Sequence, residues 1–173
     1  VQSGEYGSRE LTIRVNSIET EWHTDDLRSA AQAGPDGIVV PKVSSAADVV
    51  AVERVIEAAG VPDHTRIWAM LETPEAVERA VEIATSSERL SVLIMGTNDL
   101  AKELRAALVP GRAPLLWGLA RCLNAARYAG KIILDGVYND VRDPDGFALE
   151  ATQGAQMGFD GKTLVHPTQV EPA

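Results

Sequence analysis

Short apolar runs alternate with longer helical patterns along this 173-residue chain, and this alternation limits the fold more than any other feature. The strand-like runs are Leu11–Val15, Gly37–Val40, Arg66–Leu71, Leu90–Met95, Ile132–Val137 and Thr163–Val165. The amphipathic stretches between them are Asp25–Ala33, Ala46–Ala59, Pro74–Ala84, Asp99–Leu108 with Pro114–Ala129, and Asp145–Met157. Strands that alternate with helices pair in parallel through right-handed crossovers. The sequence therefore predicts an α/β fold with a parallel sheet.

A polar side chain stands near the C-terminal end of each strand-like run or just beyond it. These residues are Arg14, Lys42, Glu72, Asp99, Asp135 and His166. In a closed barrel they would meet at the C-terminal mouth, where such folds keep their active sites, whereas an open doubly wound sheet would spread them along an edge. We therefore expect a single TIM (β/α)8-barrel domain over residues 1–173. Because a full barrel needs roughly 250 residues, we expect about six βα units, without the first two units and the C-terminal segment. An open sheet, complete as it stands, is the alternative.

Two carboxylates follow neighbouring strands. Glu72 comes directly after five apolar residues, and Asp99 lies just beyond the next strand-like run. A buried acid needs a partner or a metal, and two carboxylates with several waters commonly hold Mg²⁺. Helix capping by Glu72 and a first-turn acid at Asp99 are the structural alternatives; a glycosidase-like acid/base pair is a further one. The three histidines show no zinc-ligand spacing. We predict that Glu72 and Asp99 bind Mg²⁺ or Mn²⁺ and are catalytic.

Two cations accompany this pair of acids. Arg14 lies within a strand-like run, where its guanidinium could grip a substrate carboxylate with two hydrogen bonds. Lys42 follows Val39-Val40-Pro41 and could orient Glu72 or neutralise charge at the mouth. We predict that both bind substrate. The alternative for Arg14 is a salt bridge with an acid of a neighbouring strand, and the alternative for Lys42 is a structural role. For Asp135 and Tyr138, in a loop rich in turn formers, the structural interpretation is favoured.

The composition excludes several classes of function. Twenty-five acids against 16 lysines and arginines give a net charge of −9, which argues against extended polyanions such as nucleic acids. One cysteine, Cys122, allows no internal disulfide and fits a reducing, cytoplasmic setting. The sequence contains no apolar run long enough for a membrane span.

Five segments, in this order, resemble the citrate lyase beta-subunit-like branch of the HpcH/HpaI aldolase superfamily. They are Ile13–Asn16, Val40–Val43, Leu71–Pro74, Gly96–Leu100 and Gly158–Gln169. The resemblance spans essentially the whole chain, and the last segment is the one that is similar to the acyl-CoA lyases.

The resemblance implies a TIM barrel, Mg²⁺ and reversible carbon–carbon cleavage of a 3-hydroxyacyl-CoA such as citryl-CoA or malyl-CoA, giving an acyl-CoA and a 2-oxo acid. It matches Glu72 and Asp99 to the metal ligands and Arg14 to the carboxylate-binding arginine. On the same basis we assign His166 and Gln169 to binding of the coenzyme A thioester. It also implies a homo-oligomer, with a trimer expected, and further lyase subunits as possible partners.

Three other functions remain open at this point. One is a pyruvate-type aldolase acting on free hydroxy-oxo acids. Another is a non-catalytic subunit that binds a CoA ester. The third is thioester hydrolysis after cleavage. The sequence does not identify the general base.

Overall fold

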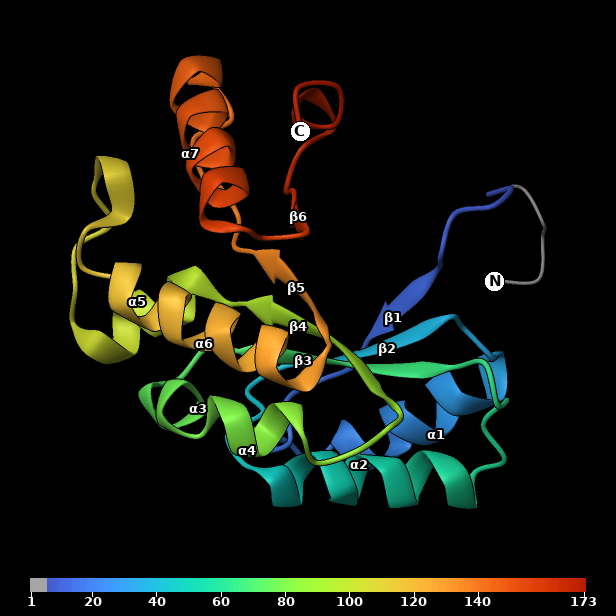
Figure 1. The fold of residues 1–173 in the computed structure, drawn as a ribbon. Helices are drawn as coiled ribbons and strands as arrows, with labels where there is room; N and C mark the ends of the chain where they lie inside the picture. Colours follow the sequence, from blue (N-terminus) through green and yellow to red (C-terminus); the bar gives the residue numbers. More distant parts are fainter. Residues whose placement is uncertain (1–5) are drawn as a thin grey trace.

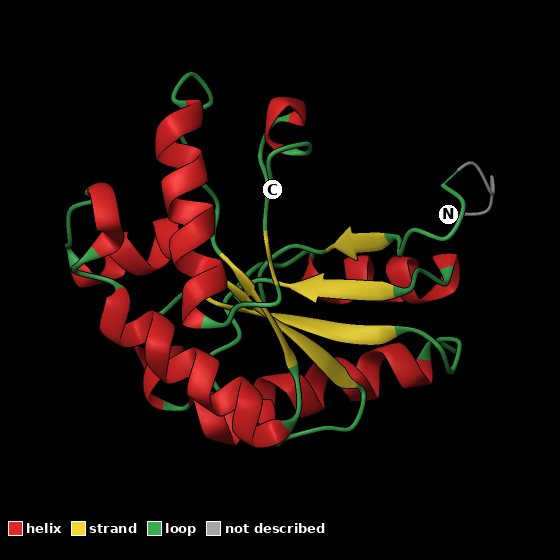
Figure 2. Ribbon diagram, turned by 45° about the horizontal axis from the view of Figure 1, so that its top comes forward, coloured by secondary structure: helices red, strands yellow, loops and turns green. Residues whose placement is uncertain are grey.

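Six strands form one parallel sheet in the order β1-β2-β3-β4-β5-β6 (Figure 1). The computed structural model describes residues 6–173. The strands are β1 (Thr12–Arg14), β2 (Gly37–Val40), β3 (Arg66–Leu71), β4 (Leu90–Met95), β5 (Ile132–Asp135) and β6 (Gly161–Lys162). The sheet curls into a half-barrel (Figure 2) with β1 and β6 at its two edges. The predicted α/β fold, with about six βα units of a TIM barrel, is confirmed.

The helices that connect the strands also follow the predicted pattern. They are α1 (His23–Ala33), α2 (Ala46–Ala58), α3 (Pro74–Glu78), α4 (Ala80–Ala84), α5 (Thr97–Leu104), α6 (Leu116–Ala129) and α7 (Pro144–Met157), with short 3-10 turns η1 (Pro110–Arg112) and η2 (Pro167–Gln169). The predicted helix over 74–84 is divided at Arg79, whose backbone leaves the helical region. None of the helices in residues 6–173 is long and apolar enough to cross a membrane.

The prediction for the last strand was wrong by two residues. Thr163–Val165 is the more apolar run, but the residues that pair with β5 are Gly161 and Lys162. The Asp160 carboxylate accepts a hydrogen bond from the main-chain N–H of Ile133, and this contact helps to set the register of the two strands. Beyond β6, the main-chain N–H of Val165 donates to the Gln169 side chain instead of extending the sheet.

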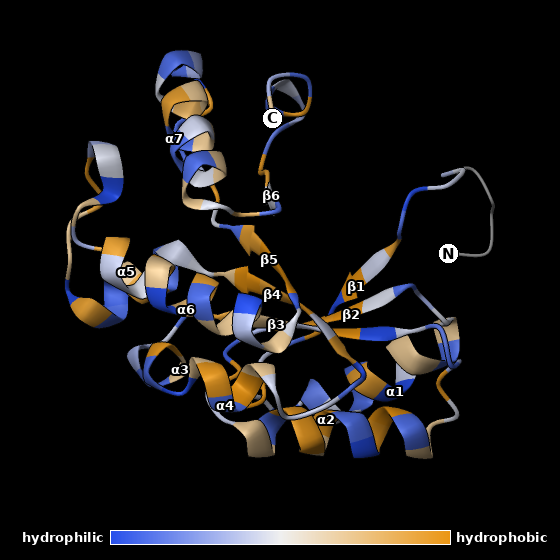
Figure 3. Ribbon diagram, in the orientation of Figure 1, coloured by the Kyte–Doolittle hydropathy of each residue, from blue (hydrophilic) through white to orange (hydrophobic). Residues whose placement is uncertain are grey.

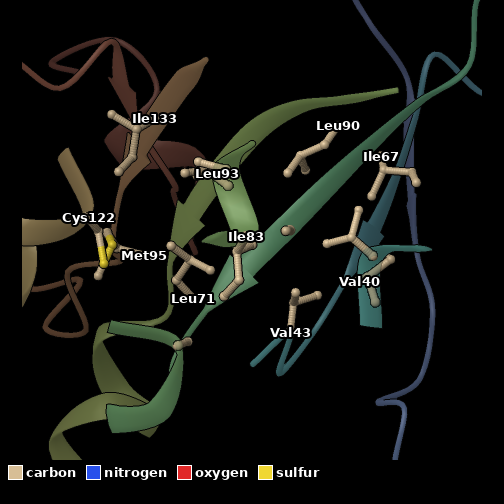
Figure 4. Packing of buried hydrophobic residues seen from close by; sticks show 14 of the residues in the cluster. Val40, Val43, Ile67, Leu71, Ile83, Leu90, Leu93, Met95, Cys122 and Ile133 are labelled. Carbon is tan, nitrogen blue, oxygen red and sulfur yellow. The ribbon is translucent and has the colours of Figure 1, made fainter. Parts of the chain in front are cut away.

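Apolar side chains cover both faces of the sheet, as the nearly continuous apolar strands predict. On the outer face, helices α1, α2, α4 and α6 pack over Val40, Ile67 and Leu93, which are fully buried (Figures 1 and 4). On the inner face, a smaller cluster contains Val39, Val92 and Ile94, with Trp68, Met70 and Leu134 packed against it. Figure 3 shows the corresponding apolar strands and the mixed character of the helices. The inner cluster forms the floor beneath the polar strand ends.

Candidate active site

A pocket of about 710 Å³ opens at the carboxyl ends of the strands, above the inner apolar cluster. It brings together four of the predicted residues, which are Arg14, Lys42, Glu72 and Asp99. Strand alternation explains why Glu72 points inward, because it continues the face of β3 that carries Trp68 and Met70. Sequence reasoning missed Trp68 as part of the pocket, although this alternation could have identified it.

Glu72 is held on two sides by main chain. Its side chain is buried, with the whole residue only 4% exposed. The main-chain N–H of Lys42 donates to Glu72 Oε1 at 2.8 Å. On the other side, a Cβ at Gly96 would collide with Cβ and Oε2 of Glu72. The capping alternative for Glu72 is not what the structure shows, since the Thr73 hydroxyl accepts from Ala76 N at the start of α3.

Asp99 lies in the first turn of α5, and the N-cap residue of this helix, Gly96, directly follows β4. The start of α5 packs closely against the loop after β5, since a Cβ at Gly136 would collide with the Thr97 side chain. The amide side chains of Asn98 and Asn139 also exchange two hydrogen bonds, of 3.0 and 2.7 Å, between these segments. Sequence reasoning did not identify Asn139, for which spacing gives no signal. These contacts fix the helix that carries Asp99.

The electrostatics of Glu72 favour a bound cation. Burial raises the pKa of Glu72 above its ordinary value; the Lys42 N–H opposes this rise, and the nearby Asp99 carboxylate adds to it. Within residues 6–173, no hydrogen bond or ion pair joins the Asp99 carboxylate to another side chain. Two close carboxylates, one buried, destabilise each other when both are ionised, and a divalent cation relieves that repulsion. The donor set therefore fits Mg²⁺.

The number of ligands agrees with that choice. Within the described part of the chain, no group of three or more His, Cys, Asp or Glu residues could hold a metal ion. Structural zinc sites need such a set. Mg²⁺ usually takes one or two carboxylates and completes its octahedron with water and substrate oxygens. Two carboxylates at the mouth of an open pocket match this preference.

The two cations take different positions. Arg14 is the last residue of β1, and its exposed side chain lines the pocket. Lys42 has a left-handed backbone with φ 54°, and its ammonium nitrogen lies 3.6 Å from the Glu19 carboxylate at the rim. Both cations lower the pKa of Glu72, although less than burial raises it. The Arg14 guanidinium forms no hydrogen bond or ion pair with another of residues 6–173, so it is available to a substrate carboxylate.

Asp135 does not face the pocket, and its expected place at the mouth is wrong. It points to the outer face of the sheet, where Arg112 Nη1 donates to both of its carboxylate oxygens at 2.6 and 2.8 Å. Lys162 Nζ lies 3.3 Å from Asp135 and 2.8 Å from Glu150. Asp135 and Arg112 are 1% and 4% exposed. The favoured structural interpretation of Asp135 is therefore supported, and Arg112 is its unforeseen partner.

Tyr138 and His166 make local hydrogen bonds outside the pocket. Tyr138 donates its hydroxyl to Asp143 at 2.6 Å, and this contact raises the pKa of Tyr138 to about 12. The exposed His166 caps η2, with Nδ1 accepting from Thr168 N. Gln169 is buried and joins Val165 N to Tyr138 O. Neither His166 nor Gln169 lines the main pocket, and their assignment to cofactor binding stays a prediction.

Glu72→Gln should raise the thermal stability of the metal-free protein near neutral pH. The pKa of Glu72 lies above its ordinary value of 4.5, so the folded state binds this proton more tightly than the unfolded state. The stability gained from that proton is full below the ordinary pKa and is lost as pH rises through the folded pKa. A glutamine at this position does not titrate, so the variant loses no stability from this group over the same pH range. Melting curves in EDTA from about pH 4 to about pH 8 should show a gap that closes toward the acid end; a pH-independent gap would contradict this account.

Comparison with known proteins agrees with the geometry. The sequence model of the HpcH/HpaI aldolase/citrate lyase family matches residues 2–167. A (3S)-malyl-CoA thioesterase of Cereibacter sphaeroides is 49% identical over 173 residues, which make up 100% of this chain and 58% of that relative. The citrate lyase beta subunit of Escherichia coli K12 is 38% identical over 171 residues, or 96% of this chain and 57% of that relative. The chain thus spans less than two thirds of each relative.

A solved structure with the same fold contains bound ligands. Protein CitE from Mycobacterium tuberculosis, in complex with magnesium, acetoacetate and coenzyme A, matches with a TM-score of 0.77 at 26% identity. The match covers 93% of this chain and 58% of that one.

Proposed function

The chain belongs to the HpcH/HpaI aldolase/citrate lyase family, and on that premise we propose that the protein is a Mg²⁺-dependent carbon–carbon lyase. Its substrate is a 3-hydroxyacyl-CoA of the citryl-CoA or malyl-CoA type, and its products are an acyl-CoA and a 2-oxo acid. One observation carries the proposal: Glu72, Asp99 and Arg14 line a single pocket at the carboxyl ends of the strands. The magnesium and coenzyme A named for the solved relative support it.

The residues divide the chemistry between them. Glu72 and Asp99 would hold the metal, and Arg14 would orient the substrate by binding its carboxylate. A bound Mg²⁺ supplies Lewis-acid stabilisation of negative charge on substrate oxygens. In cleavage, a base takes the hydroxyl proton and the hydroxyl carbon becomes the carbonyl of the 2-oxo acid. The electrons of the broken bond pass to the carbon beside the thioester, which is then protonated to give the acyl-CoA.

Hydrolysis of the thioester is the second candidate, favoured by the (3S)-malyl-CoA thioesterase relatives. The two reactions differ in their products. Cleavage of malyl-CoA gives glyoxylate and acetyl-CoA, whereas hydrolysis gives malate and free coenzyme A.

Product analysis with Mg²⁺ tests the proposal. Citryl-CoA and malyl-CoA should each be offered to the protein, with a free 4-hydroxy-2-oxo acid as the third substrate. A 2-oxo acid released from either thioester supports the lyase. Turnover of the free acid alone would identify a pyruvate-type aldolase. Malate without glyoxylate would identify a hydrolase, and binding without turnover would identify a subunit that only holds the CoA ester.

Arg14→Lys should lower kcat/KM by about tenfold to a hundredfold, because a lysine cannot form the paired hydrogen bonds of a guanidinium to a carboxylate. Steady-state kinetics on the best thioester measure this loss. Arg66→Lys is the matched control, since Arg66 begins β3 at the opposite end of the sheet. Equal kcat/KM values for the wild type and Arg14→Lys would refute the role of Arg14 in substrate binding.

We also propose that the protein is cytoplasmic and oligomeric, with a trimer as the expected state. The buried, unpaired Cys122 is in keeping with a reducing compartment. Light scattering on the purified protein measures the oligomeric state, and a monomer at assay concentrations would contradict this part of the proposal.

A further inference from the structure

Lys42 has a backbone conformation that a lysine rarely adopts. Its φ of 54° lies in the left-handed region, where the backbone of any residue other than glycine is strained. Among residues 6–173, Arg105 and Arg112 are the other non-glycine residues with positive φ. Arg105 ends helix α5, and Arg112 lies in the buried ion-pair network. Lys42 is the one of the three that lines the main pocket. Strain of this kind gathers at functional sites.

The main-chain N–H of this left-handed residue donates to the buried carboxylate of Glu72. The hydrogen bond from Lys42 N to Glu72 Oε1 is 2.8 Å long. Glu72 is 4% exposed, and Gly96 closes its other side. Rotation of the carboxylate is therefore restricted from two sides by main chain.

The ammonium group of Lys42 forms its ion pair with another residue. Its ammonium nitrogen pairs with Glu19 across 3.6 Å at the rim of the pocket, and the two side chains are 34% and 74% exposed. An exposed pair of this length contributes little to stability. The charge on Lys42 and its contact with Glu72 thus come from different parts of the residue.

We propose that Lys42 is a positioning residue whose main-chain N–H orients Glu72 for the metal, and that the site requires its left-handed backbone rather than its ammonium group. The metal part of this inference rests on the proposed function. The hydrogen bond between Lys42 and Glu72 does not rest on the proposed function, so the inference about this bond and the proposed function can be refuted separately.

The hydrogen bond is tested first, without metal. In a two-dimensional NMR spectrum in EDTA, the Lys42 amide of the wild type should exchange slowly with solvent, and Glu72→Ala should accelerate that exchange by about tenfold or more. Asp99→Ala, which removes the other carboxylate, should leave the Lys42 amide slow. Equal exchange in wild type and Glu72→Ala would overturn the inference whatever the protein catalyses.

Uncharged substitutions at position 42 then separate backbone from charge. Glycine and asparagine tolerate positive φ, whereas leucine and especially valine do not. Calorimetric Mg²⁺ titrations should give dissociation constants that rise in the order Lys42→Gly, Lys42→Asn, Lys42→Leu, Lys42→Val, with about tenfold between the first and the last. If Lys42→Val does not fold, the Mg²⁺ dissociation constants of Lys42→Asn and Lys42→Leu are the comparison that decides.

The outcomes are distinct. A dissociation constant that follows tolerance of positive φ supports the main-chain role. Four equally weakened variants, with Lys42→Arg like the wild type, would show that the ammonium group is what matters and would overturn the inference. A wild type that binds no Mg²⁺ refutes the metal part together with the proposed function, and the amide exchange then decides the rest.

Discussion

Replacing Asp99 with asparagine should lower the rate of Mg²⁺-dependent cleavage by about a thousandfold, while the protein remains folded. A metal that stabilises developing charge contributes several kcal/mol to the transition state, and each 1.4 kcal/mol is about tenfold in rate. Asparagine keeps the shape of the side chain and removes the charge that holds the cation. Glu72→Gln should have an effect of similar size. Steady-state rates at saturating substrate, measured over a range of Mg²⁺ concentrations, check both variants.

The matched control for Asp99 is another acid in the first turn of a helix. Asp145 occupies that position in α7, where it is exposed and outside the main pocket. If Asp99 only complements the helix dipole, Asp99→Asn and Asp145→Asn should behave alike, each with a small loss of stability. We expect a large loss of activity from the first and none from the second. Activity retained by Asp99→Asn with the metal chelated would refute its role as a ligand.

Asp135→Ala should lower the free energy of unfolding by about 3–5 kcal/mol, because removing one partner of a buried ion pair leaves an uncompensated charge. Arg112 is 4% exposed and depends on Asp135 for two of its hydrogen bonds. Lys162, whose side chain is 7% exposed, loses one of its two carboxylate partners. Urea denaturation followed by circular dichroism measures the change.

Two further variants give this stability prediction its controls. Asp25→Ala breaks an ion pair in which the Arg28 and Asp25 side chains are 60% and 83% exposed. Its cost in free energy of unfolding should therefore stay below about 1 kcal/mol. The double variant Arg112→Met with Asp135→Leu should recover much of the loss, since apolar residues can replace a buried pair. A cost for Asp135→Ala no greater than that for Asp25→Ala would show that the buried network contributes nothing.

Much of the fold could be predicted from periodicity. The bounds of β2, β3 and β4 agree with the predicted runs because long apolar strands are the strongest signal of a buried parallel sheet. The last strand was misplaced because its pairing depends on Asp160 and on the register with β5, which composition does not reveal. The break at Arg79 was missed for a similar reason, since the helical pattern continues through it.

The placement of the candidate site was predicted in part. Glu72 and Asp99 line one pocket, as acids at adjacent strand ends suggest because they are costly without a partner, while their roles stay predictions. Asp135 was placed at the mouth because it ends a strand, yet alternation from Leu134, which faces inward, turns it outward. The role of Lys42 was sought in its charge, whereas the contact with Glu72 comes from its main chain. Side-chain chemistry in a sequence cannot show where a backbone N–H points.

Anomalous diffraction from crystals soaked with Mn²⁺ would test the central claim most directly, because Mn²⁺ replaces Mg²⁺ at oxygen sites and its position can be seen without inference. We predict one strong peak in the pocket at the strand ends, within coordination distance of carboxylate oxygens from both Glu72 and Asp99. A peak that touches only one of these residues, a peak elsewhere on the molecule, or no peak at a Mn²⁺ concentration that supports turnover would contradict the account.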